Sequence, residues 1–322
     1  MHKVVVTRLI PEAGLKLLNN RSDIEVVLNP ADRPMARAEL LAALPGASAV
    51  LSLLTDRMDS EAMEAAGVQL KIVSNYAVGY DNIDLNAAAN RKVLVTNTPE
   101  VLTDAVAEHT VAMMCAVCRR IAEGDRLLRS GRYGGWDPLL LLGLEFKGKT
   151  LGIIGTGRIG SGVARRAALG FGMKIVYSDM KPNEALEAEL GARPLPLEQL
   201  LSEADVVSIH VPLLPSTRHL LNAEKLAIMK PTSYLINTSR GPVIDEVALT
   251  DVLRRKAIAG AALDVFENEP ALAPGLAEME NAVLTPHIAS ATYEARSAMA
   301  VLAAQAILDA LDGTEPKNLV KA

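Results

Sequence analysis

An arginine placed where a buried strand ends is the first residue of this sequence that indicates chemistry. Residues 234–238 have the pattern of a buried strand, and Arg240 follows them, directly before Gly-Pro. Such an arginine is either a solvated loop residue or a ligand for an anion, because its planar guanidinium can bind a carboxylate through two hydrogen bonds. In doubly wound α/β sheets, ligands bind at the carboxyl ends of the strands. The position of Arg240 therefore favours anion binding.

A glycine-rich turn indicates a dinucleotide-binding site. It contains Gly155, Gly157 and Gly160, stands between a predicted strand and a predicted helix, and the next strand ends in Asp179. Glycines at these places permit a tight turn and a close approach to a pyrophosphate, which the helix N-terminus attracts. Asp179 would bind the adenosine ribose and repel a 2′-phosphate. We therefore expect NAD(H) to be preferred, while Lys181 leaves NADP(H) possible.

Short β-branched runs alternate with helical patterns in two series along the chain. This alternation predicts two α/β domains, each with a doubly wound parallel sheet covered by helices on both faces. A single long helix over about residues 102–130 and a Gly-rich loop separate the series, and an Ala-rich helix lies near the end of the chain. The strands of the first series are expected at residues 3–7, 24–28, 47–52, 70–74 and 93–97.

The composition excludes several classes of partner. Half of the 322 residues are hydrophobic, the net charge is −5, and there is no run of five basic residues. Nucleic acid and membranes are therefore not expected partners. No signal peptide or membrane span is recognisable, so we expect a soluble cytoplasmic protein. Cys115 and Cys118 lack a second pair and a histidine at ligand spacing, which favours two core thiols and no metal site.

Several segments, in the same order along nearly the whole chain, resemble those of the D-isomer-specific 2-hydroxyacid dehydrogenases. The resemblance is strongest to the glyoxylate/hydroxypyruvate reductases of that family. It implies a Rossmann NAD-binding domain, residues 100–288, inserted in a flavodoxin-like substrate domain of residues 1–99 and 289–322, and a homodimer. The segments are NYAVGYDNIDL (75–85), TNTPEVLTDAVAEHT (96–110), GTGRIG, HVPLLPSTRHLLN (210–222), INTSRGPVIDEVAL (236–249), GAALDVFENEP (260–270) and TPHIASAT (285–292).

The resemblance implies three catalytic residues. Arg240 would bind the substrate, and His287 would act as the acid/base, since histidine changes charge readily near neutral pH. Glu269 would pair with His287 and favour its imidazolium form. The same acidic turn contains Glu267, which we expect to be an ordinary surface glutamate. The remaining histidines are expected to be structural: His2, His109, His210 and His219.

The resemblance also implies how the substrate is held. Backbone N–H groups of Val78 and Gly79 would bind its carboxylate, with Leu54 lining the same end and Trp136 reaching in from a partner subunit. Relatives that act on phosphoglycerate carry arginines around these segments, whereas Ser52 and Tyr76 stand here. A small 2-oxoacid without a charged tail is therefore the expected substrate.

The cofactor-lining residues are implied by the same resemblance. Asp264 would contact the nicotinamide carboxamide, and Thr103 would lie near the nicotinamide end. Ala289 replaces a glycine that is common in the family, and Leu214 and Ser216 vary a commonly more polar stretch. Neither change removes a catalytic side chain. The complete expected set is Thr103, Gly155, Gly157, Arg158, Ile159, Gly160, Asp179, His210, Val211, Pro212, Thr217, Thr238, Ser239, Asp264, His287 and Ala289.

The function implied is reduction of glyoxylate to glycolate and of hydroxypyruvate to D-glycerate, with hydride passing from the nicotinamide C4 to C2 of the oxoacid. One alternative is a dehydrogenase of the same family for D-lactate or another D-2-hydroxyacid. An alternative of another class is an NADH-sensing, corepressor-like binding protein. The presence of Arg240, Glu269 and His287 together favours an enzyme.

Overall fold

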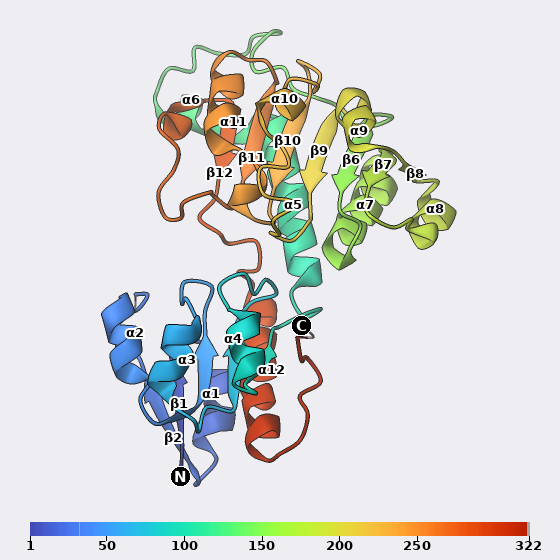
Figure 1. Cartoon of the computed structure of the whole chain (residues 1–322). Helices are drawn as coiled ribbons and strands as arrows, with labels where there is room; N and C mark the ends of the chain where they lie inside the picture. The colour runs from blue at the N-terminus through green and yellow to red at the C-terminus, as the bar shows by residue number, and fades with distance from the viewer. Residues whose placement is uncertain (32, 321–322) are drawn as a thin grey trace. The chain divides into compact units, whose positions relative to one another are not determined.

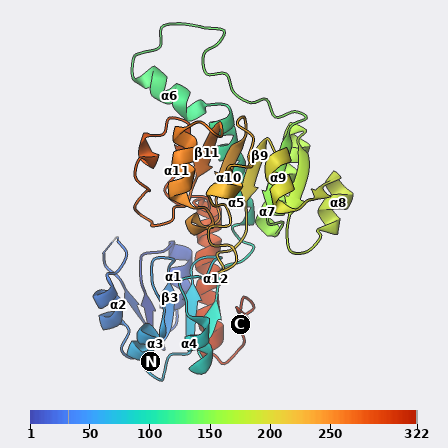
Figure 2. The same ribbon diagram turned by 45° about the horizontal axis from the view of Figure 1, so that its top comes forward.

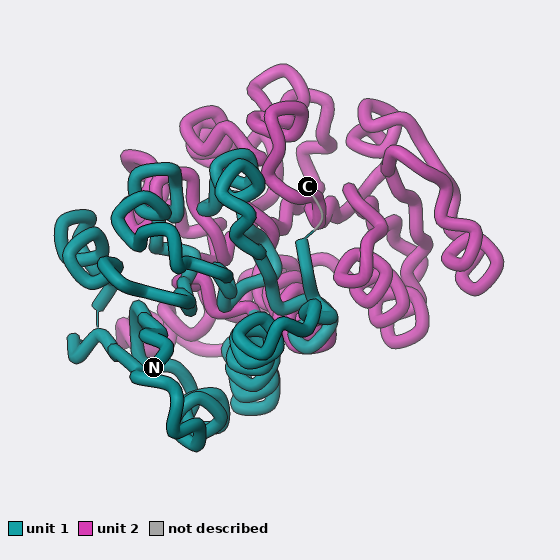
Figure 3. The backbone as a smooth tube through the Cα atoms, turned by 60° about the horizontal axis from the view of Figure 1, so that its bottom comes forward, with its two compact units in different colours: residues 1–102, 290–322 teal, residues 103–289 magenta. Residues whose placement is uncertain are grey.

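The computed structural model describes residues 1–31 and 33–320 and divides the chain into two compact units (Figure 3). Unit 1 is Met1–Leu102 with Ser290–Ala322, and unit 2 is Thr103–Ala289. Unit 2 is therefore inserted in the sequence of unit 1. The domain boundaries expected from the sequence, after residues 99 and 288, differ from these by three residues and by one.

Unit 1 is built on five parallel strands in the order β2-β1-β3-β4-β5, which is the flavodoxin-like order expected. Figure 1 labels the helices of this unit. All five lie within two residues of their predicted positions. The strands are β1 (His2–Val6), β2 (Ile24–Leu28), β3 (Ala47–Ser52), β4 (Ile72–Asn75) and β5 (Leu94–Thr96). The helices are α1 (Glu12–Asn19), α2 (Arg37–Ala43), α3 (Ser60–Ala66), α4 (Leu85–Asn90) and α12 (Tyr293–Leu311).

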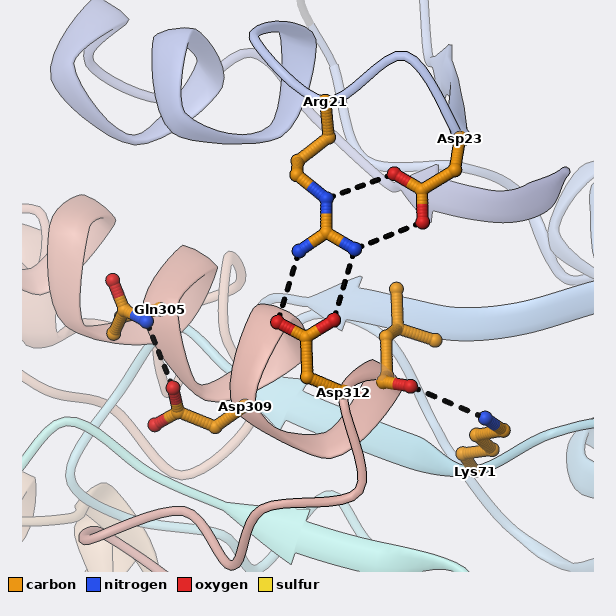
Figure 4. A network of polar contacts seen from close by, with 7 residues as sticks. Arg21, Asp23, Lys71, Gln305, Asp309 and Asp312 are labelled. Carbon is orange, nitrogen blue, oxygen red and sulfur yellow. Dashed lines mark hydrogen bonds and ion pairs between the residues drawn. The ribbon is translucent and has the colours of Figure 1, made fainter.

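Helix α12 returns from the far end of the sequence to cover one face of this sheet, beside α1. The two helices pack closely because residue 14 is glycine: a Cβ there would lie 2.5 Å from the carbonyl oxygen of Ala300. Beyond the end of α12, both carboxylate oxygens of Asp312 accept hydrogen bonds from Arg21 at 2.9 Å, and Arg21 also binds Asp23 (Figure 4). Residues at both ends of the chain thus complete unit 1.

Unit 2 is built on seven parallel strands in the order β12-β11-β10-β9-β6-β7-β8. The order reverses between β6 and β9, the switch point where doubly wound sheets bind ligands. The strands are β6 (Thr150–Ile154), β7 (Lys174–Ser178), β8 (Arg193–Pro194), β9 (Val206–Ile209), β10 (Tyr234–Asn237), β11 (Gly260–Leu263) and β12 (Ala282–Leu284). The helices are α5 (Thr103–Cys118), α6 (Ile121–Arg129), α7 (Arg158–Phe171), α8 (Glu184–Leu190), α9 (Leu197–Glu203), α10 (Ala223–Leu226) and α11 (Glu246–Arg254), with short 3-10 turns η1 (Gly241–Val243) and η2 (Leu276–Glu278).

The sheet of unit 2 separates two apolar cores. Helices α5 and α7 pack on one face, where Ile153 of β6 lies among their side chains. Helices α9, α10 and α11 cover the other face, where the next residue, Ile154, contributes. Alternate residues of one strand therefore enter different cores, as the pleat of a strand requires.

The single helix predicted over residues 102–130 is wrong, because the chain forms two helices, α5 and α6. The break lies at Arg120, which has a left-handed backbone with φ of 52°. The carbonyl of Cys118 accepts a hydrogen bond from the Leu144 N–H at 2.8 Å instead of continuing the helix. Residues 131–149 then run without helix or strand to β6, the long green segment after α6 in Figure 2.

Within residues 1–31 and 33–320, no helix is long and apolar enough to cross a membrane. The same part of the chain holds no group of three metal-binding side chains. Cys115 and Cys118 are free thiols, and burial raises the pKa of both. Cys118 lies in the core beside α7, whereas Cys115 is only partly buried.

Candidate active site

The carboxyl ends of three neighbouring strands carry Arg240, Glu269 and His287. Arg240 follows β10, Glu269 lies in the loop after β11, and His287 follows β12. The sheet is parallel, so all three residues emerge at the same edge. The structure brings two of them into direct contact: Nδ1 of His287 lies 2.9 Å from Oε2 of Glu269. We call these three residues the edge triad.

The surroundings of Glu269 stabilise its carboxylate. Burial raises the pKa of this group, but the hydrogen bond and charge of His287, the Phe266 N–H and the charge of Arg240 together lower it by more. The Phe266 N–H donates to Oε1 at 3.0 Å. Glu269 is therefore ionised at neutral pH. Because Nδ1 of His287 is bound to Glu269, Nε2 is the ring nitrogen left to exchange a proton.

The buried carboxylate of Asp264, at the end of β11, organises the loop that carries His287. The N–H groups of Ile288 and Ala289 donate to its two oxygens at 2.9 and 2.8 Å, and the Thr285 hydroxyl donates at 2.6 Å. His287 has a left-handed backbone with φ of 53°, and its N–H donates to the Asp264 carbonyl at 2.8 Å. Three consecutive N–H groups thus converge on one aspartate.

A histidine of α5 also faces this aspartate. Nε2 of His109 lies 3.5 Å from Oδ1 of Asp264 and 3.3 Å from the Thr285 hydroxyl. Burial raises the pKa of Asp264, but the bonds from His109, Thr285 and the loop N–H groups lower it by more. His109 thus contacts the side chains that organise this loop, and its structural role stays a prediction.

The glycine turn has the shape that a pyrophosphate requires. Gly155 has φ of 91°, and a Cβ there would lie 2.8 Å from the His210 carbonyl oxygen. A Cβ on Gly160 would lie 2.1 Å from the carbonyl oxygen of Gly155, so helix and turn touch directly. A Cβ on Gly157, in contrast, would meet no atom within 4 Å. The space at the N-terminus of α7 is therefore open to a phosphate group, and these residues fit a dinucleotide.

Asp179 follows β7 and is fixed beside this turn. Its Oδ2 accepts hydrogen bonds from the N–H and the hydroxyl of Thr156 at 2.6 and 2.8 Å, and its Oδ1 accepts one from the Met180 N–H. Burial would raise the pKa of Asp179, but these bonds lower it by more. An ionised carboxylate thus lines a pocket of about 240 Å³ that Lys181 also borders.

Most of the other expected cofactor-lining residues lie at the same edge of the sheet. Thr238 and Ser239 follow β10, and the Thr238 hydroxyl lies 2.8 Å from that of Thr110. Thr217 closes a turn after β9 by donating to the Pro212 carbonyl at 2.6 Å. The remaining members are found in three places: Arg158 and Ile159 at the start of α7, His210 and Val211 after β9, and Thr103 at the start of α5.

The substrate-binding residues expected in unit 1 follow β3 and β4. Side chains of Asn97 and Asn75 bind the carbonyl oxygens of Val78 and Gly79, both at 2.8 Å. Within residues 1–31 and 33–320, the N–H groups of Val78 and Gly79 donate to no acceptor. Leu54 lies in the partly buried turn after β3. Two adjacent backbone donors are thus available to an anion.

Trp136 lies in the long segment before β6 and is 84% exposed. Tyr133, Leu139 and Leu142 of the same segment are also exposed. Large apolar side chains gathered on one segment are typical of a surface that another chain covers.

A second group of the same three residue types was missed by the sequence analysis. Oε1 of Glu267 lies 2.7 Å from Nε2 of His219 and 3.1 Å from Nη2 of Arg218. The surface position expected for Glu267 is wrong, because only 14% of its side chain is exposed. We call Arg218, His219 and Glu267 the support triad. No local pattern pointed to it, because Glu267 lies 48 and 49 residues from its two partners along the sequence.

This chain is similar to known proteins over nearly its whole length. The family model for the D-isomer specific 2-hydroxyacid dehydrogenase NAD binding domain matches residues 111–289. The glyoxylate reductase of Thermococcus litoralis is 48% identical over 322 residues, covering 99% of this chain and 96% of that protein. A solved structure from Thermus thermophilus superimposes with a TM-score of 0.91 at 44% identity, covering 99% of this chain and all of that one. An NADPH-dependent glyoxylate/hydroxypyruvate reductase from Sinorhizobium meliloti, solved with NADP and malonate, has a TM-score of 0.86 at 33% identity, covering 99% and 96%.

Proposed function

This chain belongs to the D-isomer-specific 2-hydroxyacid dehydrogenase family, and on that premise we propose that it reduces glyoxylate and hydroxypyruvate to glycolate and D-glycerate. Membership makes it an NAD(P)-dependent D-2-hydroxyacid dehydrogenase. The observation that supports the proposal most directly is the His287–Glu269 contact of 2.9 Å beside Arg240.

Each residue of the edge triad has one task in the proposal. The guanidinium of Arg240 binds the substrate carboxylate and the carbonyl oxygen that gains charge. Nε2 of His287 donates a proton to that oxygen, while Glu269 holds Nδ1 and stabilises the imidazolium. The bound nicotinamide supplies the hydride. In the reverse direction neutral His287 accepts the proton of the hydroxyl group.

The cofactor residues are proposed on the fit of the glycine turn. Gly155, Gly157 and Gly160 leave the N-terminus of α7 accessible to a pyrophosphate. Asp264 keeps its proposed contact with the nicotinamide carboxamide in addition to its bonds within unit 2. In unit 1, the free N–H groups of Val78 and Gly79 support their proposed role in carboxylate binding.

The substrate proposal is tested by initial rates with several oxoacids and one reduced cofactor. We expect a higher kcat/KM for glyoxylate and hydroxypyruvate than for pyruvate, phenylpyruvate or 3-phosphohydroxypyruvate. Two observations support this order of substrates. The relative with 48% identity is a glyoxylate reductase, and positions 52 and 76 hold Ser52 and Tyr76 and no arginine that could bind a phosphate. A preference for pyruvate would favour a D-lactate dehydrogenase, and binding of NADH without turnover of any oxoacid would favour the sensing protein.

We further propose that NADH is preferred over NADPH, because the ionised Asp179 would repel a 2′-phosphate. The S. meliloti relative is NADPH-dependent, so the preference varies within the family. The preference is measured as kcat/KM for NADH divided by kcat/KM for NADPH, and Asp179→Ala should bring this ratio closer to one. A clear NADPH preference in the unaltered protein would point to Lys181 or Arg158 as a phosphate contact.

We propose a homodimer in which the exposed segment around Trp136 is covered by the second copy. Light scattering should give twice the mass of the 34.2 kDa chain. Trp136→Ala should raise KM for the oxoacid and leave the affinity for NADH nearly unchanged. An active monomer would contradict both statements.

A cytoplasmic location remains a prediction.

A further inference from the structure

Glu246, the first residue of α11, turns its side chain into the protein. Only 4% of the residue is exposed. Its Oε2 accepts a hydrogen bond from the Glu267 N–H at 2.6 Å, and its Oε1 accepts one from the Ala273 N–H at 2.8 Å. Charge-assisted bonds of this kind are short and strong, and breaking one would leave a buried group unpaired. Both N–H groups are therefore held firmly.

These two N–H groups lie at the ends of the loop that carries Glu269. Inside the loop, the Ala271 N–H donates to the Asn268 carbonyl at 2.9 Å, which closes a tight turn. The only backbone donor to the Glu269 carboxylate found in residues 1–31 and 33–320 is Phe266, directly before Glu267. The place of Glu269 is therefore set by a turn with both ends bound to one carboxylate.

The segment that carries Arg240 is locked against the same loop. A Cβ on Gly241 would lie 1.9 Å from the carbonyl carbon of Phe266, so the two backbones touch. Gly241 follows Arg240 directly, and Glu246 comes five residues later. One stretch of chain thus presents Arg240 at its start and binds the Glu269 loop at its end.

We propose that Glu246 is a positioning residue: by binding the N–H groups of Glu267 and Ala273, it fixes the turn that holds Glu269 against His287. The inference rests on the proposed function, in which Glu269 and His287 act as a pair. The side chain of Glu246 binds backbone N–H groups, and the proposal gives it no contact with the substrate. The charged groups that face this loop are Arg240 and His287 at Glu269, and Arg218 and His219 at Glu267.

The test compares kcat against pH, in the direction of reduction, for Glu246→Gln, Glu269→Gln and the double variant. An amide at position 246 keeps one acceptor but presents an N–H₂ group to a backbone N–H, so one end of the turn is released. We expect Glu246→Gln to lower kcat about 10- to 100-fold through misplacement of Glu269. It should also move the alkaline limb of the profile to lower pH, as Glu269→Gln does. The double variant should show no further shift, because both changes break the same contact.

A matched control exists one residue earlier. Oδ1 of Asp245 caps α11 by accepting from the Ala248 N–H at 2.9 Å. Asp245→Ala should lower the melting temperature by a few degrees through loss of the helix cap and leave the pH profile in place. Should Glu246→Gln fail to fold, Glu246→Asp replaces it, since it keeps the charge but shortens the reach by one methylene. It should move the limb in the same direction.

The outcomes separate the two proposals. If Glu269→Gln moves the limb and the Glu246 variants do not, the inference about Glu246 is wrong and the proposed function stands. If Glu269→Gln itself leaves the limb unmoved, the His287–Glu269 pair of the proposed function fails. An equal shift in Asp245→Ala would show that a loosened helix is sufficient, and it would overturn the role of Glu246.

Discussion

The edge triad and the support triad contain the same residue types, and their glutamates stand two positions apart in one loop, yet the two triads differ in what surrounds them. In the edge triad, His287 binds Glu269 through Nδ1, and its Nε2 remains for a substrate. In the support triad, His219 binds Glu267 through Nε2, and Arg218 takes the same oxygen. The side chain of Glu269 is 37% exposed, whereas that of Glu267 is 14% exposed.

Both triads lie in loops at the carboxyl edge of the parallel sheet, so the difference follows from what each loop is bound to. The edge triad comes from the ends of the three adjacent strands β10, β11 and β12. Arg218 and His219 lie in the loop after β9, where the His219 N–H donates to the Pro242 carbonyl at 2.8 Å. The support triad therefore joins three loops to one another. The chemical types of three residues do not decide their function, because the contacts that each residue makes differ between the two triads.

The largest expected effect separates the two histidines. His287→Ala should lower kcat about 100- to 10,000-fold in both directions, because the proton donor and acceptor is lost. His219→Ala should lower kcat by no more than a few-fold. Steady-state rates of both variants under identical conditions provide the measurement. Comparable losses in the two would erase the distinction between the triads.

Substitution of the two arginines should give a smaller difference in activity than substitution of the two histidines. Arg240→Lys replaces a two-pronged donor by a point charge, so we expect kcat/KM for glyoxylate to fall about 10- to 100-fold. Arg218→Lys keeps the charge beside Glu267 and should change kcat/KM less than twofold. Because Arg218 makes a partly exposed ion pair, with 56% of its side chain accessible, little stability should be lost. A large loss of kcat/KM in Arg218→Lys would mean that this side chain reaches the substrate.

The two glutamates sharpen the comparison through pH. The ionised Glu269 carboxylate lies 2.9 Å from Nδ1 of His287, where it attracts a positive charge on the ring. Reduction needs the imidazolium form of that ring. Glu269→Gln should therefore move the alkaline limb of the reductive profile down by about one pH unit, equivalent to about 1.4 kcal/mol. Oxidation at high pH should suffer less, because it uses the neutral ring. Glu267→Gln serves as the control, and an equal shift there would reopen the assignment of the two glutamates.

The smallest expected effect is on thermal stability, where Glu267→Gln should cost more than Glu269→Gln. Glu267 is mostly buried and binds both Arg218 and His219, so Glu267→Gln should lower the melting temperature by about 2–4 °C. Glu269 is more exposed, and Gln at that position can still accept from the Phe266 N–H. We therefore expect its melting temperature to change by about 1 °C or less. Calorimetry at pH 7 decides, and the reverse order would count against a supporting role for Glu267.

The sequence was sufficient for the parts of the molecule that depend on local pattern. The strands of unit 1 were predicted because β-branched runs stand between helical patterns, and the glycine turn because its spacing serves a defined backbone shape. Arg240 was found because it directly follows a strand. Its meeting with the loops of Glu269 and His287 then follows from one parallel sheet edge.

The parts that could not be predicted depend on contacts between distant segments. Arg218 and Glu267 meet only because the loop after β9 folds beside the loop after β11. Glu246 looks like an ordinary acidic residue at a helix N-terminus, where the helix dipole favours negative charge in any case. The break at Arg120 carries no Gly or Pro signal, and it coincides with a contact made by Leu144. In each case the information lies in tertiary packing.

The return of α12 to unit 1 has a consequence for synthesis on the ribosome. The first 102 residues emerge with the β3 and β4 face that α12 will cover still open, and the 187 residues of unit 2 must be made before that helix appears. At about 5–20 residues per second, this delay lasts roughly 10–40 seconds. Unit 2 is continuous and can fold as soon as it has emerged. We therefore expect the nascent segment of residues 1–102 to be the part that molecular chaperones must shield from aggregation, and Arg21 to meet Asp312 only after unit 2 and α12 have been made.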